Sequence, residues 1–447
     1  MNEEKIRMNK ITTSAGIVAL AAASVQAQNL APAAGSQEAT KPWSISATLR
    51  GFYDDNYATA PDWAARDSFG FEVSPSASLN LIRDQTALGL SYVYSMRWYE
   101  DRDNEGLPSA DHAHQFNAKV SHAFTPRFKL DLSDSLVYAQ EPELVESSAS
   151  GIPSTFLRGD GDVFRNYGTI SFSAGITERI TAVLGYQNEY FDYENEGLNS
   201  RSALLDRMEH RGTANLRFVV LPQTVAVAGY QYEVVDYSGD DPIGVPGFIY
   251  SSEERNSTSH YIYAGVDQGF SPTLNASLRA GAQYTEYNDL NVSKQLNPDL
   301  EEDGWAPYVD ANLTWLYMPG SYAQLGVRHQ ISQTDVGFIA TPTTPFSPNL
   351  DAESSSIYGS VSHRLFGAFI ASAIASYQHS NYDVDRGDEY ADDYFMVGLN
   401  LTYEINKFLA VEAGYNFDYL DSELDSGTQD FRSFQRNRVY VGVRGTY

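Results

Sequence analysis

The chain has 447 residues, no cysteine and a formal net charge of −28. The lack of cysteine excludes a disulfide-bonded scaffold, thiolate catalysis and a thiolate metal site. The negative charge argues against nucleic acid as a partner, because phosphate binding needs a basic face. Aromatic residues are abundant, with 31 tyrosines and 22 phenylalanines, yet no apolar stretch reaches the roughly 18 residues of a transmembrane helix.

The N-terminus has the pattern of a secretory signal peptide. Basic residues precede a short apolar stretch, and the small-x-small run Val25-Gln26-Ala27 fits cleavage by signal peptidase. We therefore predict a signal peptide at 1–27, followed by a flexible periplasmic tail at 28–42 that is rich in Pro, Ala and Ser. A start at Met8 gives a cleaner leader than a start at Met1, and the sequence leaves both open.

From residue 43 onward the chain is dominated by period-2 alternation in segments of roughly 10 to 14 residues. About 18 such segments begin near residues 43, 68, 86, 114, 127, 165, 179, 209, 223, 258, 273, 306, 321, 356, 367, 392, 407 and 434. Tight turns, such as TPR at 125–127 and INK at 405–407, alternate with long acidic loops, such as 238–256 and 383–391. This pattern is typical of a bacterial transmembrane β-barrel. We predict an all-β antiparallel barrel over 43–447 with about 18 strands, or 16 on an alternative count, with periplasmic turns and extracellular loops.

The phase of the alternation assigns the two faces of each strand. In the segment 409–419, Leu409 and Val411 alternate with Glu412 and Asp418 on the opposite face. In a membrane the apolar face points outward, because the hydrocarbon is the apolar phase and the lumen is wet. Aromatic residues near segment ends fit interfacial girdles, namely Trp98, Tyr99, Tyr190, Tyr193, Trp315 and Tyr317.

Charged residues of both signs are predicted to line the lumen. They are Arg50, Arg97, Lys129, Arg217, Arg279, Arg328, Arg364, Arg438 and Arg444, with Glu72, Asp131, Glu189, Glu233, Asp267, Asp310, Glu412 and Asp418. Two interpretations remain open. Opposed basic and acidic patches would sieve polar solutes across a water-filled lumen, or the charges neutralise one another in a packed or loop-plugged interior. Asp134 falls on the predicted lipid face, so we expect a bulge or a subunit contact there.

A glycine-led motif recurs on strands that enter long loops. Its copies are GYQNEYFDY (185–193), GYQYEVVDY (229–237), GAQYTEYND (281–289) and GYNFDYLDS (414–422). In each copy the glycine faces the lumen. Because glycine relieves crowding there and permits strand coiling, an architectural role is favoured over a ligand motif.

The chain ends on an alternating run, RNRVYVGVRGTY, at 436–447. Its lipid-facing members include Val439, Val441, Val443 and Tyr447. This strand must pair with the first strand, near 43–53, because an open sheet edge in hydrocarbon leaves backbone groups unsatisfied. The run resembles the C-terminal signal that the barrel-assembly machinery recognises, which implies that machinery as a partner. Gly445 departs from the signal, where a bulky apolar residue is usual.

Three stretches carry a resemblance to a known family: FEVSPSASLNL (71–81), GYNFDYLDSE (414–423) and FQRNRVYVGVRGTY (434–447). They resemble the Putative beta-barrel porin 2 family of Gram-negative outer membranes. The resemblance implies a barrel in the cell outer membrane, in contact with its lipids and lipopolysaccharide, and it implies no catalytic residues.

Catalytic and metal signatures are weak. None of the eight histidines has Ser two residues after it or Asp two residues before it, as the known barrel enzymes would require, so no enzyme is predicted. His112 and His114 lack a further ligand in sequence. The acidic loops 383–393 and 418–426 lack the EF-hand order. We predict no cofactor and no dedicated metal site, although loop carboxylates could bridge to lipopolysaccharide phosphates through divalent cations.

The leading hypothesis is an outer-membrane channel for passive diffusion of small hydrophilic solutes, with a cation preference from its acidic mouth. The alternative is a closed or loop-plugged barrel in surface polysaccharide export, or a structural outer-membrane protein. The segments 142–162 and 338–353 are the candidates for a loop folded into the lumen. Porins of this size are often trimers, so a homotrimer is one expectation, and the sequence does not identify the contact strand.

Overall fold

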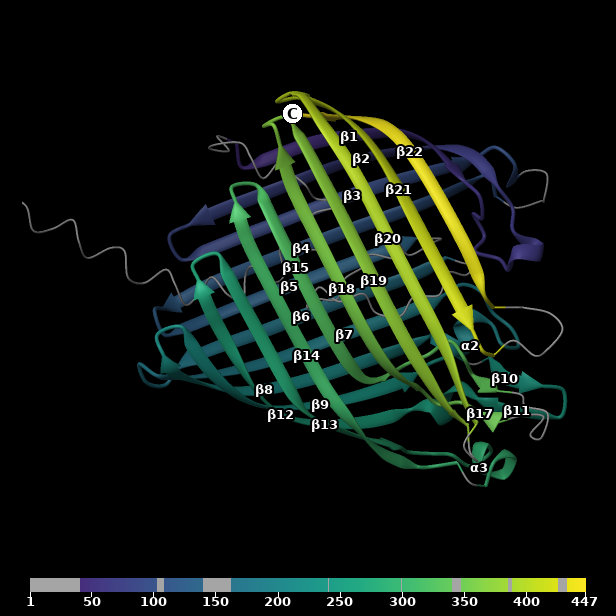
Figure 1. Ribbon diagram of the computed structural model, residues 1–447. Coiled ribbons are helices and arrows are strands. Elements are labelled where there is room, and N and C mark those ends of the chain that lie inside the picture. Colours follow the sequence, from purple (N-terminus) through teal and green to yellow (C-terminus); the bar gives the residue numbers. More distant parts are fainter. Residues whose placement is uncertain are drawn as a thin grey trace, which may run out of the picture.

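The computed structural model describes residues 41–102, 108–139, 162–239, 241–298, 300–339, 347–384, 388–424 and 432–447. Within them, 18 antiparallel strands form one closed sheet (Figure 1). They are β1 (Trp43–Asp54), β2 (Ser68–Arg83), β3 (Thr86–Tyr99), β4 (Ala110–Thr125), β5 (Phe128–Ala139), β6 (Val163–Gly175), β7 (Ile180–Tyr193), β8 (Arg207–Leu221), β9 (Thr224–Tyr237), β12 (Ser257–Ser271), β13 (Leu274–Tyr287), β14 (Asp303–Met318), β15 (Ser321–Ser332), β18 (Ala352–Leu365), β19 (Phe369–Val384), β20 (Asp388–Asn406), β21 (Leu409–Ser422) and β22 (Phe434–Thr446). The predicted barrel of 18 strands is confirmed, and the alternative count of 16 is wrong. The predicted signal peptide, and the predicted tail up to residue 40, lie outside the described residues.

The sheet closes where the last strand meets the first. β22 pairs antiparallel with β1, from Ser46 opposite Thr446 to Asp54 opposite Arg438. The closure continues beyond the strand, because the Tyr447 amide donates to the Ile45 carbonyl at 2.8 Å. Each barrel strand therefore has two neighbours, as a barrel in hydrocarbon requires.

The two ends of the barrel differ in their connections, as predicted. Tight turns join strands at the end where the C-terminus lies, and longer loops join them at the other end (Figure 1). The long loops carry small elements: η1 (Asp62–Ala64), α2 (Arg201–Leu205), β10 (Pro242–Val245), β11 (Phe248–Ser251), η3 (Ser252–Arg255), α3 (Ser293–Leu296), β16 (Phe338–Ile339) and β17 (Ser347–Pro348). None of the helices in the described part of the chain has the length and apolar character needed to cross a membrane.

Burial alternates along the strands and confirms the predicted phase. In β22, Val439 and Val441 are 48% and 61% exposed, whereas Arg436 and Arg438 are buried. Apolar residues thus point outward and polar residues inward, the reverse of a soluble domain. The aromatic girdle is only partly as predicted. Trp315 is exposed on the outer face, but Tyr99 and Tyr193 are buried inside the barrel, because their phase places them on the inner face.

Inward-facing tyrosines cover two of the repeated glycines. Tyr263 lies opposite Gly229 and Tyr440 lies opposite Gly414 in the strand register. A Cβ atom at Gly229 would lie 2.2 Å from the Tyr263 ring, and one at Gly414 would lie 2.2 Å from the Tyr440 ring. The architectural role predicted for these two glycines is confirmed, since each makes room for a tyrosine from the neighbouring strand.

The strand pairing around Asp134 is regular. Asp134 lies opposite Ala118 of β4 and opposite Gly168 of β6, with no register shift beside it on either edge. The expected bulge is therefore wrong. The side chain of Asp134 is on the lipid-facing side of a regular strand.

Candidate functional site: the lumen wall and the outer mouth

Ion pairs join charged side chains of the inner wall near the β1–β22 seam. The Arg50 Nε atom donates to Glu412 at 2.5 Å, and its Nη1 atom donates to Glu72 at 3.0 Å. The Arg97 Nε atom also donates to Glu72, at 3.1 Å. Both carboxylates are buried, with Glu412 only 2% exposed. The structure brings Arg50, Arg97 and Glu412 into one ion-paired network.

Two further groups of ion pairs lie on the opposite wall of the barrel. Asp267 of β12 pairs with Arg217 at 2.7 Å and with Arg279 at 2.6 Å. Glu233 of β9 accepts a hydrogen bond from Arg211 at 2.6 Å. Each of these carboxylates is almost fully buried. Asp267 balances only one of the two arginines to which it is bonded. The group of Asp267, Arg217 and Arg279 therefore carries a net charge of one positive unit.

Four further predicted lumen residues occupy buried or half-buried positions: Glu189, Arg328, Asp418 and Arg444. In the strand register Asp418 lies opposite Arg436, and Arg328 lies opposite Asp310. The Nε atom of Arg328 has no hydrogen-bond partner among the described residues. Arg328 therefore has spare hydrogen-bonding capacity at this nitrogen.

Two residues of these networks were missed from the sequence. Arg211 has the same odd phase as Arg217 and lies in the segment predicted to begin near residue 209, so the alternation of that segment would have found it. Asp54 binds Arg438 through the Arg438 Nε atom at 2.8 Å. Asp54 lies one residue beyond the predicted first strand, near 43–53, although it continues the even phase of Arg50 to the end of β1.

The long loops are tied together over the outer mouth by Arg255 of η3. This arginine is 1% exposed. Its guanidinium donates to three carbonyl oxygens: those of Leu204 at 2.7 Å, Leu350 at 3.3 Å and Thr334. The same group lies over the ring of Tyr237, 4.7 Å from its centroid. Arg255 thus connects the β7–β8, β9–β12 and β15–β18 loops. We call these three loops and the β13–β14 loop the loop cap.

Asp335 extends the loop cap across the mouth. Its carboxylate accepts hydrogen bonds from Arg201 at 3.2 Å and from Arg432 at 2.8 and 3.0 Å. Arg432 also pairs with Asp392 at 2.7 Å. Burial by itself would raise the pKa of Asp335, but the charge of Arg432 and its hydrogen bonds, helped by Arg201, hold that pKa below its ordinary value.

This ion pair chain connects loops on opposite sides of the barrel. Arg201 lies in the β7–β8 loop and Arg432 in the β21–β22 loop. Ten barrel strands, β8 to β21, separate the two loops in one direction, and eight separate them in the other. Asp335 therefore bridges the mouth nearly along its diameter.

The β13–β14 loop is held in the loop cap by Glu254. The Glu254 carboxylate accepts the backbone amides of Val292 at 3.0 Å and Ser293 at 2.7 Å. Tyr250 donates its hydroxyl to the Gly337 carbonyl. An apolar cluster of Ala203, Ile243 and Tyr250 lies among the same loops. Apolar packing and hydrogen bonds thus both stabilise the loop cap.

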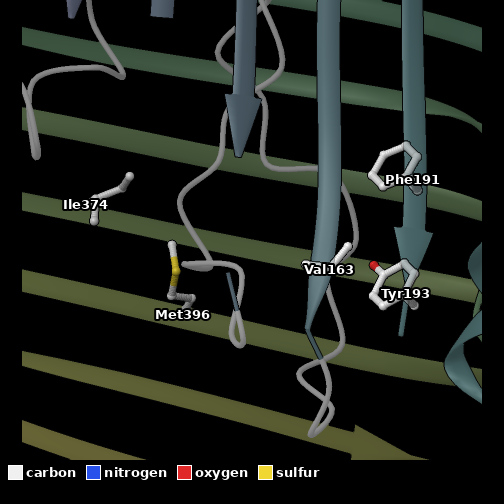
Figure 2. Close-up of a cluster of buried hydrophobic side chains, with 5 residues drawn as sticks. All are labelled: Val163, Phe191, Tyr193, Ile374 and Met396. Carbon is white, nitrogen blue, oxygen red and sulfur yellow. The ribbon is translucent and has the colours of Figure 1, made fainter. Parts of the chain in front are cut away.

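Apolar side chains also gather inside the barrel on two opposed walls. Figure 2 shows Val163, Phe191 and Tyr193 from β6 and β7, with Ile374 and Met396 from β19 and β20. All five are buried and belong to one cluster. Seven strands separate the two pairs in either direction around the sheet. Apolar burial therefore accompanies the charged networks in the interior.

The weak metal candidates have other partners. His112 and His114 accept or donate hydrogen bonds with the hydroxyls of Tyr94 and Tyr92, at 2.8 and 2.9 Å. No group of three or more potential ligands is found among the described residues. Parts of both acidic loops, 385–387 and 425–426, lie outside the described residues, as does most of the predicted plug segment 142–162. Of the other plug candidate, 338–339 and 347–353 are described, and they include the paired β16 and β17 of the loop cap.

A closed 18-stranded barrel with an apolar outer face and an ion-paired polar inner face defines a porin-like barrel of the outer membrane. The profile of the family described as Putative beta-barrel porin 2 matches residues 44–447, and the chain belongs to this family. It is accordingly a protein of the cell outer membrane. No curated protein sequence matches the chain.

Solved structures that align with this chain have low sequence identity to it. OccAB4 of Acinetobacter baumannii is 9% identical with a TM-score of 0.44, over 91% of this chain and 99% of that protein. The outer membrane protein OpdK of Pseudomonas aeruginosa is 11% identical with a TM-score of 0.43, over the same shares. The siderophore receptor PirA of Pseudomonas aeruginosa is 11% identical with a TM-score of 0.39, over 92% of this chain and 81% of that one.

Proposed function

We propose that this porin-family barrel conducts small hydrophilic solutes by passive diffusion and prefers cations. The observation that carries the proposal is the pairing of inner-wall arginines with buried carboxylates, such as Arg50 with Glu412 and Arg279 with Asp267. Arg50 and Arg97 are balanced by Glu72 and Glu412, and the Asp267 group adds only one positive unit, whereas the whole chain carries −28. The surplus carboxylates in the long loops would raise the local concentration of cations, an effect that salt screens.

Single-channel conductance of the refolded chain in a planar bilayer tests this proposal. We expect stable openings and a reversal potential that shows cation preference in a low-salt KCl gradient. The preference should weaken at high salt, because the Debye length falls from about 30 Å at 0.01 M to about 3 Å at 1 M. Equal permeability for potassium and chloride at low salt would contradict the cation preference.

A closed or gated barrel is the second candidate, because Asp335 bridges loops on opposite sides of the mouth. The apolar cluster of Figure 2 also favours a narrowed interior. Such a barrel would serve surface polysaccharide export or a structural role. A folded wild-type barrel that is silent, but conducts once the loop cap is released, would favour gating. Silence in both forms would favour a structural protein.

We propose two partners, one that contacts the outer face of the barrel and one that contacts the loops at its mouth. The exposed side chains of Val439, Val441, Val443 and Tyr447 are available to the barrel-assembly machinery. Acidic loops at the mouth would contact lipopolysaccharide phosphates through divalent cations. Deleting Tyr447 should lower the amount of folded protein in the outer membrane, measured by its heat-modifiable migration, and an unchanged amount would contradict the assembly role.

A further inference from the structure

Histidine and tyrosine side chains form a repeated pair on the lipid-facing side of the barrel. In each pair, Nδ1 of the histidine is hydrogen-bonded to a tyrosine hydroxyl of the preceding barrel strand, at a distance between 2.7 and 2.9 Å. The two ring centroids lie 6.1 to 6.3 Å apart. The pairs are His112 with Tyr94, His114 with Tyr92, His210 with Tyr186 and His260 with Tyr230. One geometry is thus repeated at the starts of β4, β8 and β12.

The strand register explains why the geometry repeats. Tyr186 lies opposite Gly212, and Tyr230 lies opposite Ile262. Each tyrosine is bonded to the histidine two residues before its register partner, a diagonal neighbour that a long side chain can reach. The histidine is therefore the member of the pair that lies nearer to the long loops.

These histidines lie at the outer boundary of the apolar band. On β8 the outward positions 212, 214 and 216 carry no polar side chain, and the next outward residue toward the long loops is His210. On β12 the same is true of the outward positions 262, 264 and 266, which are followed by His260. Long loops of outer-membrane barrels are extracellular. The histidines therefore lie where the hydrocarbon of the outer leaflet meets its headgroups.

Each ring has a second nitrogen that the barrel does not use. A tyrosine hydroxyl that donates to Nδ1 leaves the ring proton on Nε2. At His210 the amide of Asn188 also approaches Nδ1, at 3.3 Å, which again leaves Nε2 as the donor. Among the described residues, Nε2 of these four histidines has no hydrogen-bond partner. The outer face thus presents four N–H donors at one boundary of the apolar band.

We propose that these four histidines bind the phosphate groups of lipopolysaccharide in the outer leaflet. Nε2–H donates to a phosphate oxygen, and a hydrogen bond to a charged acceptor is about twice as strong as a neutral one. The acyl chains of the same lipid lie along the apolar outward positions of the strands. This contact is direct, so it differs from the cation-bridged contact of the acidic loops. It does not depend on whether the barrel conducts.

His379 on β19 provides a control within the same chain. It also lies on the outer face, but its Nδ1 is bonded to the Asp393 carboxylate at 2.8 Å. The same carboxylate accepts the Tyr377 hydroxyl at 2.6 Å. Because a carboxylate beside the ring repels an anion, we expect no lipid phosphate at His379.

Native mass spectrometry of the detergent-solubilised barrel tests the proposal. The probe is the diphosphorylated lipid anchor of lipopolysaccharide, compared with the same lipid after removal of its phosphates. EDTA is present throughout, so divalent cations cannot bridge the lipid to the loops. We expect the phosphorylated form to bind roughly tenfold or more tightly, the factor that corresponds to one hydrogen bond to a charged group. Equal affinity for the two forms, or binding that EDTA abolishes, would overturn the proposal.

Variants test whether the histidines are responsible. Replacing all four by phenylalanine should remove the preference for the phosphorylated lipid, whereas His379→Phe should keep it. His260→Phe alone should lower the number of tightly bound phosphorylated lipids by one, and this single change tests the proposal even if the fourfold variant does not fold. Heat-modifiable migration shows which variants are folded. An unchanged number for folded His260→Phe, or an equal loss for His379→Phe, would contradict the assignment.

Discussion

Asp54 of β1 is bound by Arg436 of β22, residues that are 382 positions apart in the chain. The Arg436 Nε atom lies 2.9 and 3.0 Å from the two Asp54 oxygens, and Arg438 donates to the same carboxylate. Asp54 is fully buried and Arg436 is 1% exposed. This contact lies at the seam where the first and last strands close the barrel.

We therefore expect Asp54→Asn to destabilise the barrel by about 3–5 kcal/mol, because removing one partner of a buried ion pair leaves the other charge uncompensated. The measurement is urea unfolding of the protein in detergent, monitored through the loss of its heat-modifiable migration. Asp62→Asn is the control, because Asp62 is exposed in η1. Equal stability of the two variants would show that the seam pair contributes little.

Removing the charge of Asp267 should shift selectivity toward anions. In Asp267→Asn, Arg217 and Arg279 lose the carboxylate that they share, so the inner wall gains one positive charge. One unit charge at about 4 Å contributes about 1 kcal/mol in water, against the cation and in favour of the anion, so the cation-to-anion permeability ratio should fall roughly thirtyfold. The reversal potential in a KCl gradient measures this ratio. Glu178→Gln, in an exposed tight turn, should leave it unchanged, and the same value in both variants would rule out control by Asp267.

Replacing Arg255 should loosen the loop cap. Arg255→Met keeps much of the side-chain length but removes three hydrogen bonds to backbone carbonyls. Each such bond from a charged donor contributes about 1.5–3 kcal/mol, so protease cleavage in the β7–β8 and β15–β18 loops should accelerate by about tenfold or more. Lys294→Met provides the comparison, because the exposed pair of Lys294 with Glu302 contributes little. Similar cleavage rates in the two variants would contradict the role given to Arg255.

The loop beside α2 should depend on pH through Asp206. Burial raises the pKa of Asp206 to about 6, although hydrogen bonds from Ser202 and from the Tyr193 amide act in the opposite direction. Because this folded-state value exceeds the ordinary one, the folded loop binds the proton more tightly than the unfolded loop. The associated stability is fully present below about pH 4 and is lost as the pH rises through 6.

Hydrogen exchange of residues 194–206, corrected for intrinsic rates, measures this dependence. Protection should be greater at pH 5 than at pH 8 in the wild type. Asp206→Asn should reduce the difference, since the variant has no proton to lose. A wild-type loop equally protected at both values would contradict the assignment.

The architecture of this protein can be predicted from its sequence. Alternation with period 2 reports directly which residues face lipid, because hydrocarbon accepts only apolar side chains, and the contrast between turns such as 125–127 and loops such as 238–256 reports the two ends of the barrel. The C-terminal run predicted its own pairing with the first strand, because an unpaired edge is too costly in a membrane. The inward phase of Arg50, Arg279 and Glu412 followed from the same periodicity.

The ion-pair partners of the charged residues, in contrast, depend on the tertiary structure. Which carboxylate meets which arginine depends on strand stagger, so the sharing of Asp267 by Arg217 and Arg279 has no local sequence signal. The bridge from Arg201 through Asp335 to Arg432 depends on where three loops fold, and loops lack the periodicity that made the strands readable. For Asp134, one property could be predicted from the sequence and others required the structure. Its lipid-facing phase was visible in the sequence, whereas the regular pairing around it and the recess that it shares with Gly168 and Asn188 required the assembled sheet.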